Sequence, residues 1–598
     1  MTKHDGPPEK IRSRAALTAM VTIGVGMLAL AERLLALFIS TDRRWPHSVL
    51  LEGDALLWID WLRSIREGTL FELGLAIHSP VVPFLLAILG ADPSSSDWTQ
   101  YKVVWCLFSA LTCSLLYLAA LRTVGPIVAL LAAVWFAFAY HASALATSLN
   151  GEVVYSLLVV AIVLVGTIRP PALAKRSLLV VALGLLHGAA TLTRAEHPLL
   201  MLMMLASAAL LPSRDQGDAV PSARARLLSA LGVAFIAAAV CMPWAISGAR
   251  AAARLNTTLV VPMNYDQFVP PWTDDARAYL DTLPAFVRPD NAAYLSALAT
   301  QRGESVIDSE RVRRYFLDEF GWIPTPLSTR PRVSSQGPLC FALANHPDSG
   351  GGFSRAALDD RFAPDPNLTF SLPSHLRLFN EGYAVGLETI RADPSGWISL
   401  LGRKMLRFEA GLTGGLGVTD APIGRELVRW PVDLAARPMS PAAWSTRPWL
   451  DSVRVDALWW RVPILLLMFV GAARLLPSRR AAPWLLILAS KVVVTLAFYG
   501  YVRQGASILP VTSILIAAGV VYTSQWWGAE RRWIIGGVAI VSVAVVVMDV
   551  RELSRPMIPT IEADADAVRP ARVGAAYGAF ECLKELRIEY APSQPNVP

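Results

Sequence analysis

The chain has 598 residues, of which 54% are hydrophobic and only 17% are charged. Soluble globular domains usually carry about a quarter charged residues, so this composition indicates a polytopic membrane protein. The net charge of +7 does not indicate a nucleic-acid partner, because the arginines stand mostly at the ends of apolar segments. The five cysteines show no metal-ligand spacing, which argues against a disulfide framework and a structural zinc site.

Eleven apolar segments approach the length of about 20 residues that a helix needs to cross the hydrocarbon of a membrane. They lie near residues 15–38, 101–121, 126–142, 146–168, 177–193, 197–212, 227–247, 457–475, 482–500, 507–527 and 533–549. The sequence therefore predicts a mainly α fold with about eleven transmembrane helices.

The distribution of basic residues predicts the orientation of these helices. The N-terminal sequence is basic and lacks a small-residue cleavage site, so we expect it to be retained on the cytoplasmic side. Alternation from this start brings the arginine pairs at 479–480 and 531–532 to the cytoplasmic face, as the positive-inside rule requires. The opposite face then receives the long segments between spans.

The predicted spans divide the chain into four parts. We expect an N-terminal transmembrane catalytic module at 1–247, with its first outer loop at 41–100. An extracytoplasmic domain follows at 248–455, and C-terminal transmembrane helices at 456–550 precede an extracytoplasmic tail at 551–598. We expect the chain to lie in the plasma membrane of a bacterium, with the large loop outside.

The segment 248–455 is rich in proline and charge, and we expect a small mixed domain there. Three stretches show the helical period of apolar residues, at 305–320, 374–392 and 395–411. No internal repeat is visible, and the two halves of the chain differ in length, which weighs against an inverted-repeat transporter.

A carboxylate precedes a predicted surface helix in the first outer loop. At 100° per residue, Trp58, Trp61 and Ile65 fall within about 40° of Asp54, whereas Arg63 lies on the far side. We expect the tryptophan face to turn toward lipid or protein, which would place Asp54 at a partly desolvated interface suited to a base. The local alternative is that Asp54 is the N-cap of this helix.

Ionisable residues recur at the outer ends of several predicted spans. They are Asp54 and His78 in the first outer loop, Glu152, Arg194 and Glu196, and Arg503. A charge within lipid costs at least about 2.5 kcal/mol, so such groups normally face a protein cavity and pair with one another. We therefore predict a polar cavity near the outer membrane boundary.

Each of these residues also has a local alternative. Glu152 could cap its helix, Arg194 and Glu196 could pair and snorkel, and His78 before Pro80 could shape a turn. Two further ionisable residues, at 32 and 33, lie close enough to the end of the first span to snorkel.

Several segments together resemble one family of membrane enzymes. They include "EGDALLWIDWLRSIREG" with "IHSPVVP", "LNGEVVYSLL", "TLTRAEHP", "MPWAISGARAAARLN", "GWISLLGRKMLRF" and "YVRQGASILP". In this order they are similar to motifs of GT-C fold glycosyltransferases, the superfamily of protein mannosyltransferases and aminoarabinose transferases. The chain departs from these motifs at Ala195, at Ser247 and at Gln504, where the family often has proline, arginine and tyrosine.

The resemblance implies an inverting transfer of a sugar from a polyprenyl-phosphate donor to a lipid, glycan or protein acceptor. Asp54 would be the general base, and Lys404 and Arg503 would hold the donor phosphate. His78, Glu152, Arg194 and Glu196 would orient the sugar or the base. A divalent metal could also act, since members of the family differ in their use of metal. Because no DxD-like pair with a second ligand is evident, we expect neither a metal nor another cofactor, and the lipid-linked sugar is a substrate.

Two other classes of function remain as alternatives. A transporter or lipid flippase would use charges along a path through the membrane. A non-catalytic scaffold or receptor would use the outer domain for sensing. The concentration of polar residues at one membrane face favours a fixed catalytic site over either alternative.

Overall fold

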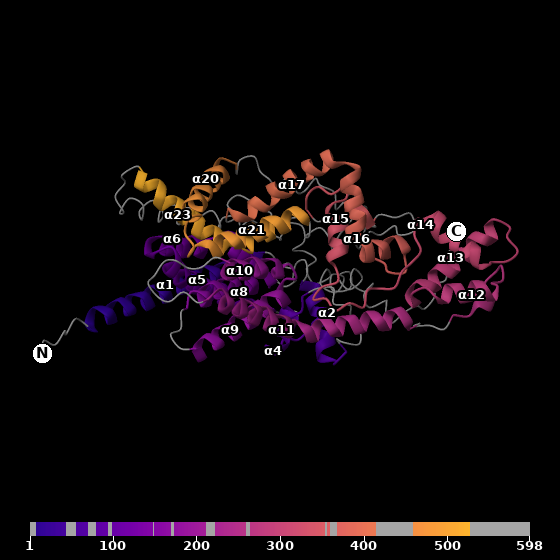
Figure 1. Ribbon diagram of the computed structural model, residues 1–598, viewed down its shortest axis with the longest axis horizontal. Coiled ribbons are helices and arrows are strands. Elements are labelled where there is room, and N and C mark those ends of the chain that lie inside the picture. Colours follow the sequence, from indigo (N-terminus) through magenta and orange to yellow (C-terminus); the bar gives the residue numbers. More distant parts are fainter. Residues whose placement is uncertain are drawn as a thin grey trace.

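The computed structural model describes residues 8–43, 55–69, 79–93, 98–147, 149–168, 173–210, 222–258, 263–352, 356–358, 368–413, 458–500 and 502–526. These residues form a bundle of apolar helices and a lobe that protrudes from it (Figure 1). Within the described ranges there is no β-strand, and the one strand-like pairing is a bridge between Trp272 and Ile307. The predicted mainly α class is confirmed.

The bundle contains α1 (Pro8–Arg43), α5 (Thr99–Thr123), α6 (Pro126–Ala137), α7 (Tyr140–Thr147), α8 (Gly151–Gly166), α9 (Leu173–Thr193), α10 (His197–Leu210), α11 (Ala223–Thr257), α20 (Leu458–Leu475), α21 (Ala482–Ala497), α22 (Val502–Ala506) and α23 (Leu509–Trp526). Two shorter helices, α2 (Ala55–Arg66) and α4 (Val81–Ile88), lie beside it. The lobe and its connection contain α12 (Asp274–Asp281), α13 (Arg288–Gln301), α14 (Ser309–Phe320), α15 (Gly337–Ala344), α16 (Pro373–Ala392) and α17 (Pro394–Leu412).

The apolar helices identify an integral membrane protein. Among the helices that the structure describes, three are long and apolar enough to cross a membrane alone, at 15–37 in α1, at 99–123 in α5 and at 223–257 in α11. Shorter apolar helices occupy most of the other predicted segments. The segment predicted at 533–549 lies outside the described residues.

The segment predicted as one span at 126–142 is not a single straight helix. Helices α6 and α7 are bent by 63° at a break of a few residues. Arg33 of α1 donates hydrogen bonds to the carbonyl oxygens of Phe136 and Ala137 at the end of α6. The guanidinium thereby satisfies carbonyl groups that a helix end leaves without partners.

Arg33 is fully buried, so the expectation that it snorkels toward the membrane surface is wrong. Its Nε donates to Ser109 Oγ of α5 at 3.0 Å, and its Nη1 lies 2.8 Å from Glu32 Oε2. Ser143 of α7 also donates to Glu32. This cluster joins α1, α5, α6 and α7.

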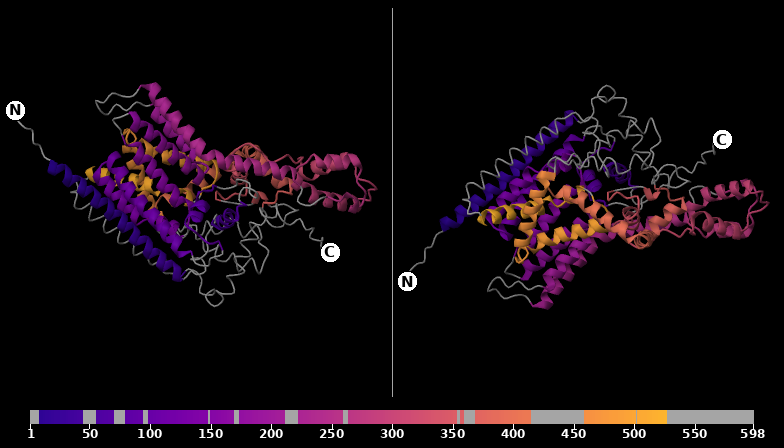
Figure 2. Two further views of the ribbon diagram at one scale, coloured as in Figure 1. Left: turned by 90° about the horizontal axis from the view of Figure 1, so that it is seen from below. Right: turned by 90° about the horizontal axis from the view of Figure 1, so that it is seen from above.

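Close helix packing builds the rest of the bundle. A Cβ atom at Gly184 or Gly188 of α9 would overlap Ile236 or Val240 of α11. The glycines, four residues apart, therefore allow the two helices to approach closely, as small residues do in membrane helix pairs. The same α11 continues from the bundle into the lobe (Figure 2).

The length of α11 explains how the lobe is attached. Its 35 residues extend over about 52 Å at 1.5 Å per residue, which exceeds the roughly 30 Å of membrane hydrocarbon. The lobe has its own core, in which Trp272, Phe316 and Phe370 are buried. The three predicted amphipathic helices of this region are confirmed as α14, α16 and α17. The sequence analysis predicted mixed secondary structure for this domain, but the described part of the lobe is helical.

Candidate functional site

The tryptophan face of α2 turns toward protein. Trp58 and Trp61 are both buried, and the ring of Trp61 lies 5.2 Å from that of Trp244 in α11. A Cβ atom on Gly151 would lie 3.7 Å from the indole of Trp58. The segment that follows the predicted base is therefore anchored beside the first residue of α8. Asp54 itself and His78 lie outside the described residues.

The start of α8 places Glu152 among cations. Its Oε1 accepts a hydrogen bond from Arg194 Nη1 and lies 3.0 Å from Arg503 Nε. Arg194 lies in the turn between α9 and α10, and Arg503 belongs to α22. Two hydrogen bonds hold this arrangement, from Trp105 Nε1 to the carbonyl of Asn150 at 3.0 Å and from Ser156 Oγ to that of Ser507 at 2.8 Å.

A second carboxylate extends the arrangement to α21. Glu196 Oε1 accepts a hydrogen bond from Arg194 Nε and another, at 2.8 Å, from Lys491 Nζ. Lys491 Nζ also donates to Gln504 Oε1 at 3.0 Å. We call Glu152, Arg194, Glu196, Lys491 and Arg503 the charged network. Four of the residues predicted for the site are thus brought together, from three separate regions of the sequence.

The charged network has a buried side and a partly exposed side. The side chains of Glu152 and Lys491 are 3% and 2% exposed, whereas those of Glu196 and Arg503 are 20% and 21% exposed. Three cations face two carboxylates, which leaves one positive charge in excess. The network can therefore attract an anion at its exposed edge, where Arg503 provides a planar set of donors.

Aromatic and imidazole groups border the buried side. Lys491 Nζ lies 4.7 Å from the centroid of the Tyr155 ring, a favourable cation–π distance. The Tyr155 hydroxyl is 3.2 Å from His197 Nδ1, and His197 Nε2 is 2.9 Å from His187 Nδ1. His187 thus bonds to a residue of the neighbouring α10. These groups fix the positions of α8, α9, α10 and α21 around the network.

Lys404 has a different environment from the other predicted site residues. Its side chain is fully buried, and Nζ donates to Asn345 Oδ1 and to the carbonyl of Leu496, each at 3.0 Å. Asn345 Nδ2 in turn donates to the carbonyl of Ala497 at 3.0 Å. Both carbonyls belong to the last turn of α21, so this pair caps the C-terminus of the helix that carries Lys491.

Burial lowers the pKa of the Lys404 amine to about 7. A neutral amine has two N–H groups, which matches the two neutral acceptors around it. Backbone packing still connects Lys404 to the segment before Arg503, because a Cβ atom at Gly500 would overlap the Lys404 carbonyl. The expectation that Lys404 holds a phosphate stays a prediction, since it would first have to release its acceptors.

Two residues of this site, Lys491 and Gln504, were not predicted from the sequence. Lys491 is a lone charge within the apolar segment at 482–500, and an ionisable residue inside a membrane helix is a signal of function in itself. Gln504 was recognised only as a departure from the family pattern. The structure gives its amide oxygen a partner in Lys491.

Both network carboxylates are engaged by cations. Among the residues that the structure describes, no group of three His, Cys, Asp or Glu side chains could hold a metal ion. The guanidinium and ammonium groups of the network can bind and stabilise negative charge.

No family model and no curated protein sequence matches the chain. Several solved structures do match the chain. An oligosaccharyltransferase from Archaeoglobus fulgidus in complex with zinc and sulfate matches with a TM-score of 0.40 and 12% identity over 88% of this chain. The chain spans about half the length of that protein, 53%. AglB from the same organism, in complex with an inhibitory peptide and a dolichol-phosphate, matches with a TM-score of 0.36 and 12% identity over 88% of this chain and 56% of its own.

ArnT from Cupriavidus metallidurans, bound to undecaprenyl phosphate, matches with a TM-score of 0.29 and 16% identity. The match covers 83% of this chain and 78% of ArnT.

Proposed function

We propose that the chain is an inverting glycosyltransferase that moves a sugar from a polyprenyl-phosphate donor to an acceptor on the extracytoplasmic face of the membrane. The observation that carries this proposal is the charged network, which gathers three cations and two carboxylates from distant segments and leaves a partly exposed positive edge.

The leaving phosphate needs stabilisation of its negative charge during transfer. Arg503 is the residue best suited to provide it, because it is the most exposed cation of the network and guanidinium groups match phosphate oxygens. Arg194 and Lys491 add positive potential behind it. Glu152 and Glu196 hold these cations in place, and a phosphate at the exposed edge would compensate the excess charge.

The acceptor hydroxyl needs a base as it attacks. We assign this role to Asp54, which precedes Trp58 by four residues in the sequence, a spacing that places two residues on one face where a helix contains both. Since Trp58 packs beside Gly151, a base at this position would be close to the start of α8 and therefore to Glu152. His78 would orient the sugar in the same space. Attack from the face opposite the phosphate would invert the anomeric centre.

Binding of the carrier lipid tests the phosphate site. We expect Arg503→Gln to weaken the binding of undecaprenyl phosphate in nanodiscs at least tenfold. Arg250→Gln is the matched control, because Arg250 is an exposed arginine at the lobe end of α11. Unchanged affinity of the Arg503 variant, with a folded protein, would contradict the assignment of the donor phosphate to this edge.

A pair of isosteric substitutions tests the base. Asp54→Asn should abolish sugar transfer from a polyprenyl-phosphate sugar in membranes while lipid binding survives. Asp60→Asn removes the same charge from the opposite side of the same helix and should leave transfer intact. Transfer that persists in Asp54→Asn would remove this residue from the mechanism and favour a lipid flippase.

The orientation forms part of the proposal, with about eleven spans in a bacterial plasma membrane, a cytoplasmic N-terminus and the lobe outside. Asp274→Cys in the lobe should react with a membrane-impermeant maleimide in intact cells. Arg224→Cys, at the opposite end of α11, should react only after permeabilisation. The reverse pattern would place the site on the cytoplasmic face.

A further inference from the structure

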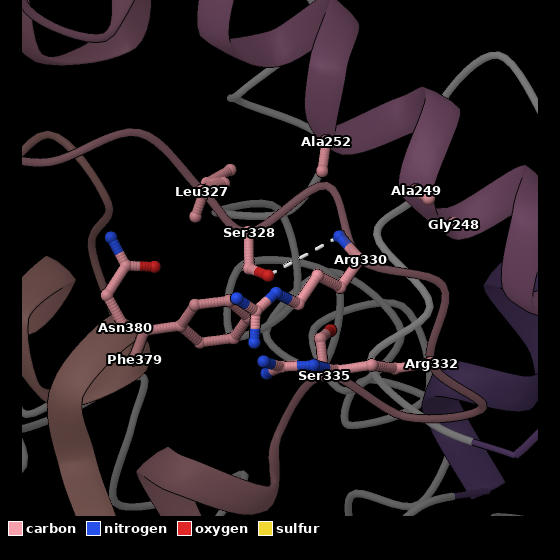
Figure 3. A pocket seen from close by; sticks show the side chains of 10 residues that line it. All are labelled: Gly248, Ala249, Ala252, Leu327, Ser328, Arg330, Arg332, Ser335, Phe379 and Asn380. Carbon is pink, nitrogen blue, oxygen red and sulfur yellow. Dashed lines mark hydrogen bonds between the residues drawn. The ribbon is translucent and has the colours of Figure 1, made fainter.

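A second polar pocket lies outside the charged network, where α11 leaves the bundle for the lobe. Its walls are α11, the loop at 327–335 and α16 (Figure 3). The residues that line it are Gly248, Ala249, Ala252, Leu327, Ser328, Arg330, Arg332, Ser335, Phe379 and Asn380. None of them belongs to the charged network.

Two side chains of α11 clamp the loop across this pocket. Asn256 accepts a hydrogen bond from the Leu327 amide at 2.8 Å and donates one to the Leu327 carbonyl at 2.9 Å. Trp244 Nε1 donates to the carbonyl of Val333 at 2.9 Å. Between these two attachment points α11 presents small residues such as Gly248, which leave the space that the pocket occupies.

The pocket is strongly positive. Arg330 and Arg332 both line it, no Asp or Glu is among its described lining residues, and neither arginine forms an ion pair with a described carboxylate. Figure 3 shows both side chains extending from the loop toward the α16 side of the pocket. Both arginines are exposed to solvent, so an anion entering the pocket could reach both guanidinium groups.

The surroundings connect the pocket to the proposed base. Val333 of the clamped loop packs in one cluster with Trp61 of α2 and Trp244 of α11. Helix α2 begins directly after Asp54. A molecule held in the pocket would therefore lie beside the helix that follows the base, which is the position of an acceptor.

We propose that this pocket binds a phosphate group of the acceptor, a proposal that rests on the glycosyltransferase function given above. A phosphate monoester carries a charge of about −1.5 to −2 at pH 7, which matches two guanidinium groups, whereas a carboxylate carries one charge. The acceptor would thus be recognised by charge at some distance from the hydroxyl that reacts.

Inorganic phosphate is a suitable probe of the pocket in the full-length protein in nanodiscs. Amide hydrogen exchange at 328–335 should slow in phosphate relative to chloride of equal ionic strength. In the double variant Arg330→Gln/Arg332→Gln, half-maximal protection should need at least tenfold more phosphate. The double variant Arg313→Gln/Arg391→Gln, which changes two exposed lobe arginines, should behave like the native protein. Equal protection in the pocket variant, or equal protection by acetate, would overturn the proposal.

A parallel measurement tests whether the pocket binds the acceptor or the donor. It also tests the role of the pocket separately from that of the charged network. The pocket variant should bind undecaprenyl phosphate with native affinity. If it loses that lipid as well, the pocket belongs to the donor and the acceptor assignment fails. If Arg503→Gln instead keeps undecaprenyl phosphate while the pocket variant loses inorganic phosphate, the function proposed for the charged network fails and the phosphate pocket stands.

Discussion

Two clusters of charged residues in the bundle contain arginine beside glutamate. The arginine guanidinium groups of the two clusters donate their hydrogen bonds to different kinds of acceptor. Arg33 is fully buried, and it bonds to two backbone carbonyls, a serine and Glu32. Arg194 and Arg503 instead bond to carboxylates, and 14% and 21% of their side chains stay exposed. A guanidinium whose donors satisfy the backbone stabilises a helix break, whereas one shared between carboxylates at an exposed edge can exchange partners with a ligand.

The largest effect should follow removal of the central cation. Arg194→Met leaves Glu152 and Glu196 without their common partner, and breaking a buried ion pair in this way costs about 3–5 kcal/mol. We expect the thermal unfolding midpoint of this variant in detergent to fall strongly. Arg194→Lys, which keeps the charge, should lose less. A stable Arg194→Met variant would mean that the network is not held by its ion pairs.

A conservative change at the other cluster should affect stability alone. Arg33→Lys keeps the partner of Glu32 but loses the planar set of donors that reaches Phe136, Ala137 and Ser109. Leaving buried acceptors unsatisfied costs about 1–3 kcal/mol. The unfolding midpoint should fall while undecaprenyl phosphate binds with native affinity. Weaker lipid binding would show that the two clusters do not differ in function.

The ion pair between the α9–α10 turn and α21 can be measured by a double-mutant cycle. Lys491→Met and Glu196→Gln should each destabilise the protein, and their combination should cost less than the sum. Because the two groups are 2.8 Å apart, we expect a coupling of about 0.5–3 kcal/mol. Additive effects in the unfolding midpoint would mean that Arg194 alone neutralises Glu196.

The smallest effect concerns pH and Lys404. Burial lowers the pKa of this amine to about 7 from its ordinary value of 10.5, so the fold favours the neutral form. The stability penalty of charging it is full below about pH 7 and disappears as the pH rises toward 10.5. The unfolding midpoint of the native protein should therefore rise between pH 7 and 9 more than that of Lys404→Met. Equal slopes would show that the lysine stays charged in the fold.

Local patterns predicted most of the helices and part of the site. Charges such as Glu152, Arg194 and Arg503 stand at the ends of apolar segments, where hydropathy changes sharply, and these residues do meet. Lys491 was not predicted as a site residue because it lies in the middle of such a segment, where only its partners on other segments explain its presence. The break after Ala137 has no local signal either, since neither Phe138 nor Ala139 is a helix breaker. Arg33, about a hundred residues earlier, supplies the bonds that stabilise it.

The clamp formed by Asn256 bears on how the protein should be produced. This asparagine begins the sequence Asn-Thr-Thr, an acceptor for N-linked glycans in eukaryotic secretory pathways. Its amide group is engaged with Leu327 in the folded chain. A glycan added there before folding would keep the loop from docking on α11, so yeast or insect-cell expression calls for a glycan-deficient host or for substitution of Thr258.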